Sequence, residues 1–305
     1  MKLRVKLILF CLVIAVTFTA LVVVGQIALA LQQDEHTIGV IAHRGYWNTE
    51  SSAENSISSL QNAESILCYG SECDVHLTAD NKLIVIHGPK HVEYISDVRE
   101  ATFEDIRTHL LANNELVPSF EEYLDAYKNT EHTKLIIEIK DTGDALRNLY
   151  LTEQIISLVS SYDIEERVEY ISFNRMICDG VLNLRPDADV YYLGGDMSPS
   201  ELKLLGYTGL DYNIRILQQN PHWIEEAHEL GLLVIVWEAN NPDAQWMEWA
   251  IDNDVDYITT DFPVIAQEMI LEDKHSLHSF MTSITSFFIS DDITTQRIYH
   301  ASNHI

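Results

Sequence analysis

Basic residues are scarce in this chain. Its 305 residues include 19 Lys and Arg against 47 Asp and Glu, which gives a formal net charge of -28 at pH 7. Nucleic acid is not expected as a partner, because a protein neutralises its phosphates with clustered positive side chains. A small anionic substrate is compatible with this composition if a bound cation and a few local bases reverse the field at the site.

Cysteine is also rare, with four residues in the whole chain. Cys11 lies in an apolar segment, and Cys68, Cys73 and Cys178 are too few and too scattered for a disulfide framework. An oxidising compartment would permit one bond among them.

The N-terminal segment lacks charge over a long run. Three basic residues in "MKLRVK" are followed by no charged residue between positions 7 and 33. Residues 1–32 are therefore predicted to be a signal anchor or signal peptide that forms a hydrophobic helix. The length favours an uncleaved anchor, although Ala28-Leu29-Ala30 also fits a cleavage site. Both interpretations place the remainder on the extracytoplasmic side, either membrane-anchored or secreted.

Short β-branched runs alternate with longer amphipathic runs in the rest of the chain. Eight strands are predicted, near residues 37–43, 71–77, 134–140, 168–173, 188–194, 208–213, 232–239 and 256–261. Helical patterns lie between them, so we expect an α/β fold, a (β/α)8 TIM barrel over residues 36–272. In such a barrel the active site lies at the carboxyl ends of the strands.

Two segments depart from this alternation. Residues from about 80 to 117 are predicted to form an insertion after strand 2, on the face where long connections usually bind or cover something. Residues 273–305 are rich in Ser, Thr and His and show no clear period. They are predicted to form a poorly ordered C-terminal tail.

Carboxylates stand at the ends of two predicted strands. Glu72 and Asp74 are two residues apart in "SECDVHL", so both side chains point to one face of the strand, and Glu138 lies in "IIEIK". Converging acids would repel one another inside an apolar barrel, and a divalent metal removes that conflict. An all-oxygen set suits Mg²⁺ or Ca²⁺ better than Zn²⁺. Taken singly, each of these motifs is more often a solvated edge or an ion-pair partner.

Eight motifs in one order give the chain a resemblance to a known family. They are "HRG" at 43–45, Glu54-Asn55, "ECDV" at 72–75, His87, "EIK" at 138–140, Ser172-Phe173, "WEAN" at 237–240 and "DYITTDFP" at 256–263. This order resembles the glycerophosphodiester phosphodiesterase family over about residues 37 to 270. The resemblance implies a metal-dependent TIM-barrel enzyme that hydrolyses glycerophosphodiesters to glycerol 3-phosphate and an alcohol.

The resemblance also implies roles for individual residues. It assigns the metal to Glu72, Asp74 and Glu138, and the general acid and base to His43 and His87 without saying which is which. It assigns substrate binding to Arg44, Lys140, Glu54, Asn55, Phe173 and Trp237, with Arg44 and Lys140 on the phosphate. The partners implied are a small glycerophosphodiester and, through the N-terminal segment, a membrane.

Two departures from the family pattern bear on function. Gly88 follows His87 where the family usually has Asp, which would change the tautomer preference of the histidine if that Asp orients it. Glu238 puts a charge beside Trp237, and strand alternation predicts that its side chain faces away from the lumen. Plain core packing is the alternative role for Trp237 and Phe173. The functional alternatives are a related barrel phosphodiesterase acting on lysolipids or phospholipids, and a barrel that binds phosphodiesters without turnover.

Overall fold

A computed structural model describes residues 37–88, 96–238, 241 and 244–274. The predicted anchor at 1–32 lies outside the described residues, as does the predicted tail from residue 275 onward. Residues 273 and 274 still belong to the last helix, which runs from 263 to 274. Within the described part of the chain, no helix combines the length and apolar character needed to cross a bilayer.

Eight parallel strands close into a barrel, which confirms the predicted fold. They pair in the order β1-β9-β8-β7-β6-β5-β4-β2, and β1 also pairs with β2, so the sheet has no open end between them. The strands are β1 (Gly39–Ala42), β2 (Gly70–Leu77), β4 (Lys134–Ile139), β5 (Val168–Ser172), β6 (Asp189–Tyr192), β7 (Gly209–Asn213), β8 (Leu233–Glu238) and β9 (Tyr257–Thr260). Each predicted strand corresponds to one of these.

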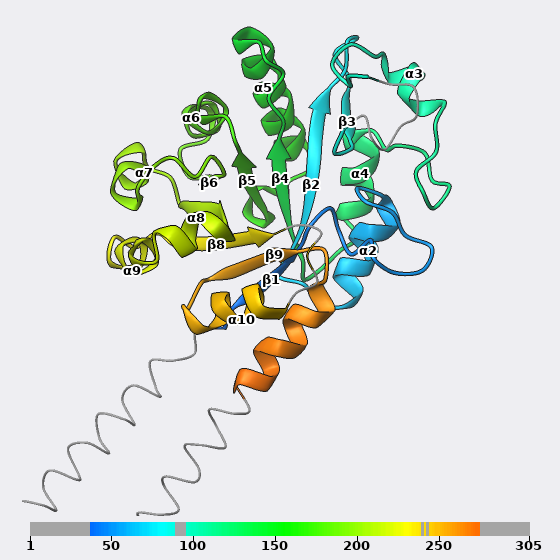
Figure 1. The fold of residues 1–305 in the computed structure, drawn as a ribbon. Coiled ribbons are helices and arrows are strands. Elements are labelled where there is room, and N and C mark those ends of the chain that lie inside the picture. The colour runs from blue at the N-terminus through cyan, green and yellow to red at the C-terminus, as the bar shows by residue number, and fades with distance from the viewer. Residues whose placement is uncertain (1–36, 89–95, 239–240, 242–243, 275–305) are drawn as a thin grey trace, which may run out of the picture. The chain divides into compact units, whose positions relative to one another are not determined.

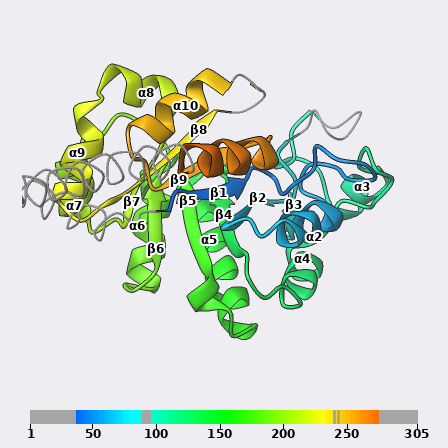
Figure 2. The same ribbon diagram turned by 90° about the horizontal axis from the view of Figure 1, so that it is seen from below.

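Helices surround the strands on the outside of the barrel (Figures 1 and 2). They are α2 (Ile57–Ser65), α4 (Phe120–Tyr127), α5 (Ala145–Ser161), α6 (Arg175–Leu184), α7 (Pro199–Leu205), α8 (Ile214–Gln219), α9 (His222–Glu229) and α10 (Ala244–Asp252). Local sequence explains their ends, as α7 illustrates. Ser198 caps its first turn together with Glu201, Pro199 opens the helix, and Gly206 closes it with φ of 81°.

The apolar core has two parts because strand side chains alternate between two faces. Leu210 and Tyr212 of β7 belong to the large cluster that packs strands against helices. A smaller cluster, which includes Ile41, Ile136 and Ile235, fills the middle of the barrel. Side chains therefore fill the middle of the lumen. Space for a ligand remains only beyond this cluster, at the ends of the strands.

The predicted insertion follows β2 and carries its own small core. Strand β3 (Leu83–Val85) pairs antiparallel with β2, and helix α3 (Phe103–Arg107) follows it. The carboxylate of Glu115 accepts a hydrogen bond from the backbone N–H of Ile57 at 3.0 Å, at the start of α2. This contact joins the insertion to the segment that follows β1.

The three described cysteines are free thiols. Cys68, Cys73 and Cys178 are all buried, and none is joined to another. The single disulfide that the sequence permitted is therefore absent among the described residues. Burial raises the pKa of the Cys68 and Cys178 thiols to about 12, which keeps both protonated and unreactive.

Deleting a buried leucine should measure how strongly the outer core supports the barrel. Leu210 is completely buried, whereas Leu204 on α7 is 87% exposed. We expect Leu210→Ala to lower the free energy of unfolding by about 2 to 5 kcal/mol, since it leaves a cavity. Leu204→Ala, the matched control, should change it by less than about 0.5 kcal/mol. Urea denaturation of both variants tests this, and equal effects would contradict it.

Candidate active site

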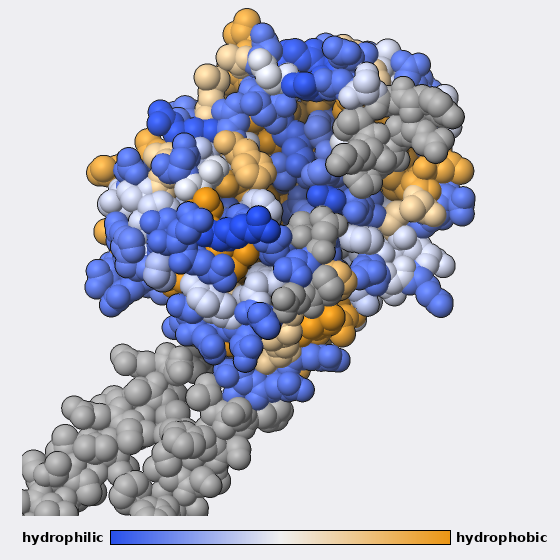
Figure 3. All heavy atoms as spheres, in the orientation of Figure 1, coloured by the Kyte–Doolittle hydropathy of each residue, from blue (hydrophilic) through white to orange (hydrophobic). Residues whose placement is uncertain are grey.

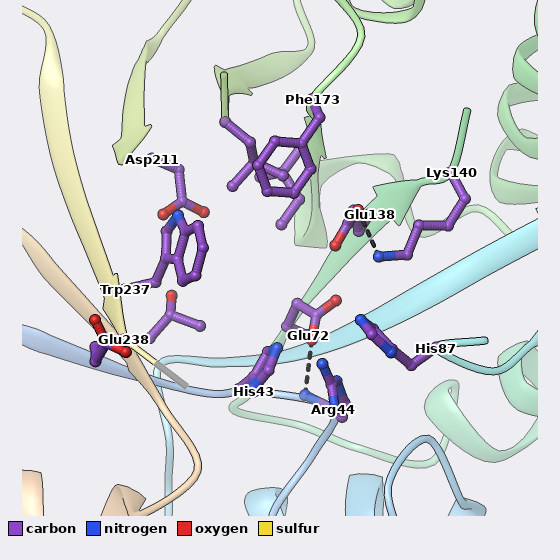
Figure 4. Close-up of a pocket in the computed structure, with 13 residues that line it drawn as sticks. His43, Arg44, Glu72, His87, Glu138, Lys140, Phe173, Asp211, Trp237 and Glu238 are labelled. Carbon is purple, nitrogen blue, oxygen red and sulfur yellow. Dashed lines mark hydrogen bonds and ion pairs between the residues drawn. The ribbon is translucent and has the colours of Figure 1, made fainter. Parts of the chain in front are cut away.

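A pocket opens at the carboxyl ends of the strands, and ionisable side chains line much of it (Figure 4). Surrounding surface on the face seen in Figure 3 is mostly hydrophilic, with apolar residues in separate small groups. The lining residues are His43, Arg44, Glu72, His87, Glu138, Lys140, Ile171, Phe173, Leu193, Asp211, Trp237, Glu238 and Thr259. The structure thus brings together both predicted histidines, both predicted phosphate-binding bases and two of the three predicted metal ligands.

The three predicted ligand carboxylates converge. Glu72 and Asp74 come from β2 and Glu138 from the neighbouring strand β4, where Asp74 is in register with Glu138. One oxygen from each lies within 4.8 Å of the others, and all three residues are buried. Glu72 Oε2 accepts a hydrogen bond from the backbone N–H of Arg44 at 2.7 Å, but Glu72 Oε1 has no partner among the described residues.

The pKa values of Glu72 and Glu138 are both raised by their surroundings. Burial raises the pKa of Glu72 well above its usual range, and the charges of Asp74 and Glu138 raise it further. Burial also raises the pKa of Glu138, against the opposing charge of Lys140. Two buried acids with raised pKa values, a third carboxylate beside them and an unpaired oxygen on Glu72 fit a divalent cation, which would favour the charged form of all three.

Lys140 partly offsets the acids. Its Nζ lies 2.6 Å from Asp74 Oδ1 and 2.6 Å from Glu138 Oε1. Burial opposes the charge on Lys140, but these two carboxylates more than compensate and raise its pKa. Burial likewise opposes ionisation of Asp74, yet Lys140, His87 and Arg44 lower its pKa below the usual range. Arg44 Nε also lies 3.6 Å from Asp74 Oδ2, so two cations face three acids and a local excess of negative charge remains.

Arg44 is held in an unusual backbone conformation at the end of β1. Its φ is 57°, in the left-handed region that non-glycine residues rarely adopt. Gly45 follows with φ of 75°, and a Cβ there would lie 2.4 Å from the Ser59 hydroxyl on α2. Only glycine permits this close approach, which turns the chain sharply so that the Arg44 side chain enters the pocket.

Glu54 and Asn55, predicted to bind substrate, do not line the pocket. Glu54 Oε2 accepts a hydrogen bond from Arg44 Nη1 at 2.8 Å. Asn55 donates from Nδ2 to Asp74 Oδ2 at 2.7 Å and accepts from the backbone N–H of Asp74 at 3.0 Å. Glu54 therefore positions Arg44, which lines the pocket, and Asn55 positions Asp74, which does not line it itself.

The two histidines lie on the same side of the pocket and have different surroundings. His43 Nδ1 is 2.7 Å from Asp261 Oδ1, so Nδ1 carries the proton in the neutral ring and Nε2 is the remaining nitrogen. Burial, opposed by Asp74, lowers the pKa of His87 to about 3, and the charges of Lys140 and Arg44 add to this. His87 is a neutral imidazole near pH 7 in this environment.

The prediction for the side chain of Glu238 was wrong. Strand alternation placed it outside the lumen, but Glu238 lines the pocket next to Trp237. It is the last residue of β8, so the pleat that enforces alternation ends there. Asn213 Nδ2 donates to the Trp237 carbonyl at 3.3 Å and to Glu238 Oε2 at 3.4 Å, which holds the side chain over the strand end.

Sequence reasoning missed two acids at this site. Asp261 lay in a quoted motif without a role, yet its carboxylate contacts His43 and accepts from Trp47 Nε1 at 3.2 Å. Asp211 lines the pocket from β7 and was not considered. The sequence did contain a pattern that could have identified Asp211, because it is an acid within the apolar strand "GLDYN", as Glu72 is an acid within its own strand.

Comparison with known proteins gives consistent matches. The model of the glycerophosphoryl diester phosphodiesterase family matches residues 43–265. A glycerophosphodiester phosphodiesterase of Caldanaerobacter subterraneus subsp. tengcongensis is 26% identical over 240 residues, 73% of this chain and 94% of that protein. The crystal structure of a glycerophosphodiester phosphodiesterase from Parabacteroides distasonis is 40% identical, with a TM-score of 0.75, over 78% of this chain and 99% of that one.

A more distant structure shares the fold. It is a phosphodiesterase from Oleispira antarctica solved in complex with the product sn-glycerol-3-phosphate. The identity is 18% and the TM-score 0.65, over 77% of this chain and 97% of that one.

Metal binding by the carboxylates should be visible without any substrate. We expect Mg²⁺ or Ca²⁺ at about a hundredfold excess over its Kd to stabilise the folded protein by about 2.7 kcal/mol. Glu72→Gln should abolish this stabilisation, measured as a shift in unfolding temperature, while Glu248→Gln on the exposed face of α10 should retain it.

The stabilisation by the ion should also depend on pH. Because the raised pKa values of Glu72 and Glu138 make protons compete with the ion, it should shrink as the pH falls. An undiminished gain in Glu72→Gln would mean that the ion binds elsewhere.

Proposed function

The chain belongs to the glycerophosphoryl diester phosphodiesterase family and is a phosphoric diester hydrolase, and from this we propose that it hydrolyses glycerophosphodiesters to glycerol 3-phosphate and an alcohol. The observation that carries the proposal is a cluster of three buried carboxylates, two of which line the same pocket as two bases and two histidines. Family membership argues against the alternative of a barrel that only binds phosphodiesters.

Glu72, Asp74 and Glu138 would hold a divalent ion, Mg²⁺ or Ca²⁺. When bound, the ion supplies Lewis-acid stabilisation of the charge that builds up on the phosphoryl oxygens. Asn55 keeps Asp74 in position through two hydrogen bonds, and the backbone of Arg44 fixes one oxygen of Glu72. These contacts orient the carboxylates before any ion arrives.

Arg44 and Lys140 would hold the phosphate. The guanidinium of Arg44 can contact two oxygens at once, and the ammonium of Lys140 acts as a point charge beside Asp74 and Glu138. Burial opposes the charge on Arg44, but the neighbouring acids Asp74, Glu54 and Glu72 raise its pKa. Both side chains therefore stay cationic while facing a phosphodiester.

His43 and His87 would divide the proton transfers. One takes a proton from the attacking hydroxyl, and the other gives one to the oxygen of the departing alcohol. Asp261 holds His43 with Nε2 as the nitrogen available to substrate. For His87 the family position of an orienting acid is occupied by Gly88, and the nearby charge of Asp74 is the acid that acts on His87 most strongly.

We also propose that the enzyme acts outside the cytoplasm, tethered or exported by its first 32 residues. The support is the basic start and the long uncharged run of that segment. A tether would hold the pocket near lipid-derived substrates. Release of a lipid product from lysolipids or phospholipids would favour the alternative substrate class.

Removing either histidine should abolish turnover without unfolding the protein. We expect His43→Ala and His87→Ala to reduce release of glycerol 3-phosphate by a factor of about 10² to 10⁴, since each loses one proton transfer. His132→Ala is the matched control, because His132 is exposed before β4 at the opposite end of the strand. An enzyme-coupled glycerol 3-phosphate assay measures the rates, and near-normal rates in both variants would refute the assignment.

The location of the enzyme can be tested in cells. We expect a reporter that is active only outside the cytoplasm, fused after residue 274, to be active with the full N-terminus and inactive when residues 1–32 are deleted. Carbonate extraction then distinguishes the anchored protein from the exported one, because an uncleaved anchor keeps the protein in the membrane pellet. Reporter activity that does not depend on residues 1–32 would contradict the proposal.

A further inference from the structure

His76 is a histidine beside the pocket to which the proposed hydrolysis gives no role. It lies on β2 two residues after Asp74 and four after Glu72, so strand alternation places its side chain on the same face as those two carboxylates. It is half-buried and does not itself line the pocket. A histidine in this place would have to affect the reaction through another residue.

The ring of His76 contacts the backbone of His87. His76 Nε2 lies 3.1 Å from the His87 carbonyl oxygen. A carbonyl oxygen can only accept a hydrogen bond, so Nε2 carries a hydrogen and donates it. The pairing of β2 with β3 brings the two residues together, because His76 is in register with Ile84 and the chain reaches His87 three residues later.

His87 lies at the point where the β2–β3 ladder ends. The backbone N–H of Ile86 donates to the Asp74 carbonyl at 3.0 Å, which extends the ladder to the residue before His87. Gly88 comes next, and a Cβ added there would meet no atom within 4 Å among the described residues. Glycine has more backbone freedom than any other residue, and no neighbouring atom among them restricts this one at that position. The hydrogen bond from His76 therefore restrains the backbone between the end of the ladder and a glycine.

The placement of the His87 ring depends on that backbone. Figure 4 shows the ring pointing into the pocket, near Arg44 and Lys140. A rotation of the main chain at residue 87 would carry the imidazole with it. Proton transfer requires the imidazole within hydrogen-bond reach of the substrate, and a misplacement of about 1 Å can cost about 10²-fold in rate.

We infer that His76 is a positioning residue for the reaction: its Nε2–H holds the His87 carbonyl so that the His87 imidazole stays where it can transfer a proton. The inference rests on the proposed function. Both the neutral and the charged ring of His76 can supply a hydrogen on Nε2, so this role does not depend on the charge of His76. Because phosphate binding is assigned to Arg44 and Lys140, loss of the contact should affect turnover more than substrate binding.

Replacing His76 tests the hydrogen bond. We expect His76→Leu to lower kcat by about tenfold with little change in KM, since the imidazole of His87 is misplaced while the phosphate is still held. His76→Gln, whose amide N–H can donate to the same carbonyl, should restore most of kcat. The substrate is glycerophosphocholine, glycerophosphoethanolamine or glycerophosphoglycerol, whichever the wild-type enzyme hydrolyses fastest.

His228→Leu is the matched control for these variants. It removes another histidine whose Nε2 contacts an oxygen, Asp256 Oδ2 at 3.0 Å, at the amino end of β9 and therefore opposite the pocket. We expect it to leave kcat unchanged. An unchanged kcat in His76→Leu would overturn the inference, and so would an equal loss of kcat in His76→Leu and His76→Gln.

A double-mutant cycle shows whether His76 acts through His87. In a His87→Ala background, we expect His76→Leu to change the remaining kcat by less than about twofold, because the residue that it positions has lost its imidazole. A loss in that background as large as in the otherwise wild-type enzyme would overturn the inference, since His76 would then act on a different group.

Hydrogen exchange gives a measurement that needs no turnover. We expect the amides of residues 83–88 to exchange faster in His76→Leu than in the wild type, and at the wild-type rate in His76→Gln. Equal exchange in all three proteins would overturn the inference. If the wild-type enzyme releases no glycerol 3-phosphate from any of the three esters, the proposed function is wrong, and the exchange rates still decide whether His76 restrains His87.

Discussion

The mutual repulsion of Glu72, Asp74 and Glu138 is the constraint on which the rest of the site depends. Two acids on one strand and a third on its neighbour are forced into the same space by register, and burial denies them water. Ionising all three without compensation would cost several kcal/mol for each charge. Lys140 and Arg44 compensate part of this, and the arrangement of the three carboxylates could hold a divalent ion.

A second layer of contacts exists to hold this charged cluster in one arrangement. Asn55 engages Asp74 through both ends of its amide, and the left-handed turn at Arg44 and Gly45 directs a backbone N–H at Glu72. Backbone conformations of this kind persist only where surrounding structure enforces them. The segment after β1 therefore positions the carboxylates of β2.

Charge is divided across the pocket instead of being spread evenly. Bases and histidines lie by β1, β2 and β4, whereas Asp211 and Glu238 lie by β7 and β8, with Phe173 and Trp237 beside them. In this strongly acidic chain, Arg44 and Lys140 thus make the potential less negative on one side of the pocket only.

The sequence by itself determined the barrel, because β-branched runs with period two and amphipathic runs between them admit few other topologies. It also determined that Glu72 and Asp74 share a face, since two residues on a strand always do. The tertiary structure alone decided that Asp261 orients His43 across 218 positions, that Glu54 and Asn55 support other side chains, and that Glu238 turns inward. Periodicity governs side chains within a regular strand, but contacts between distant segments and at strand ends depend on how the barrel closes, which no local pattern contains.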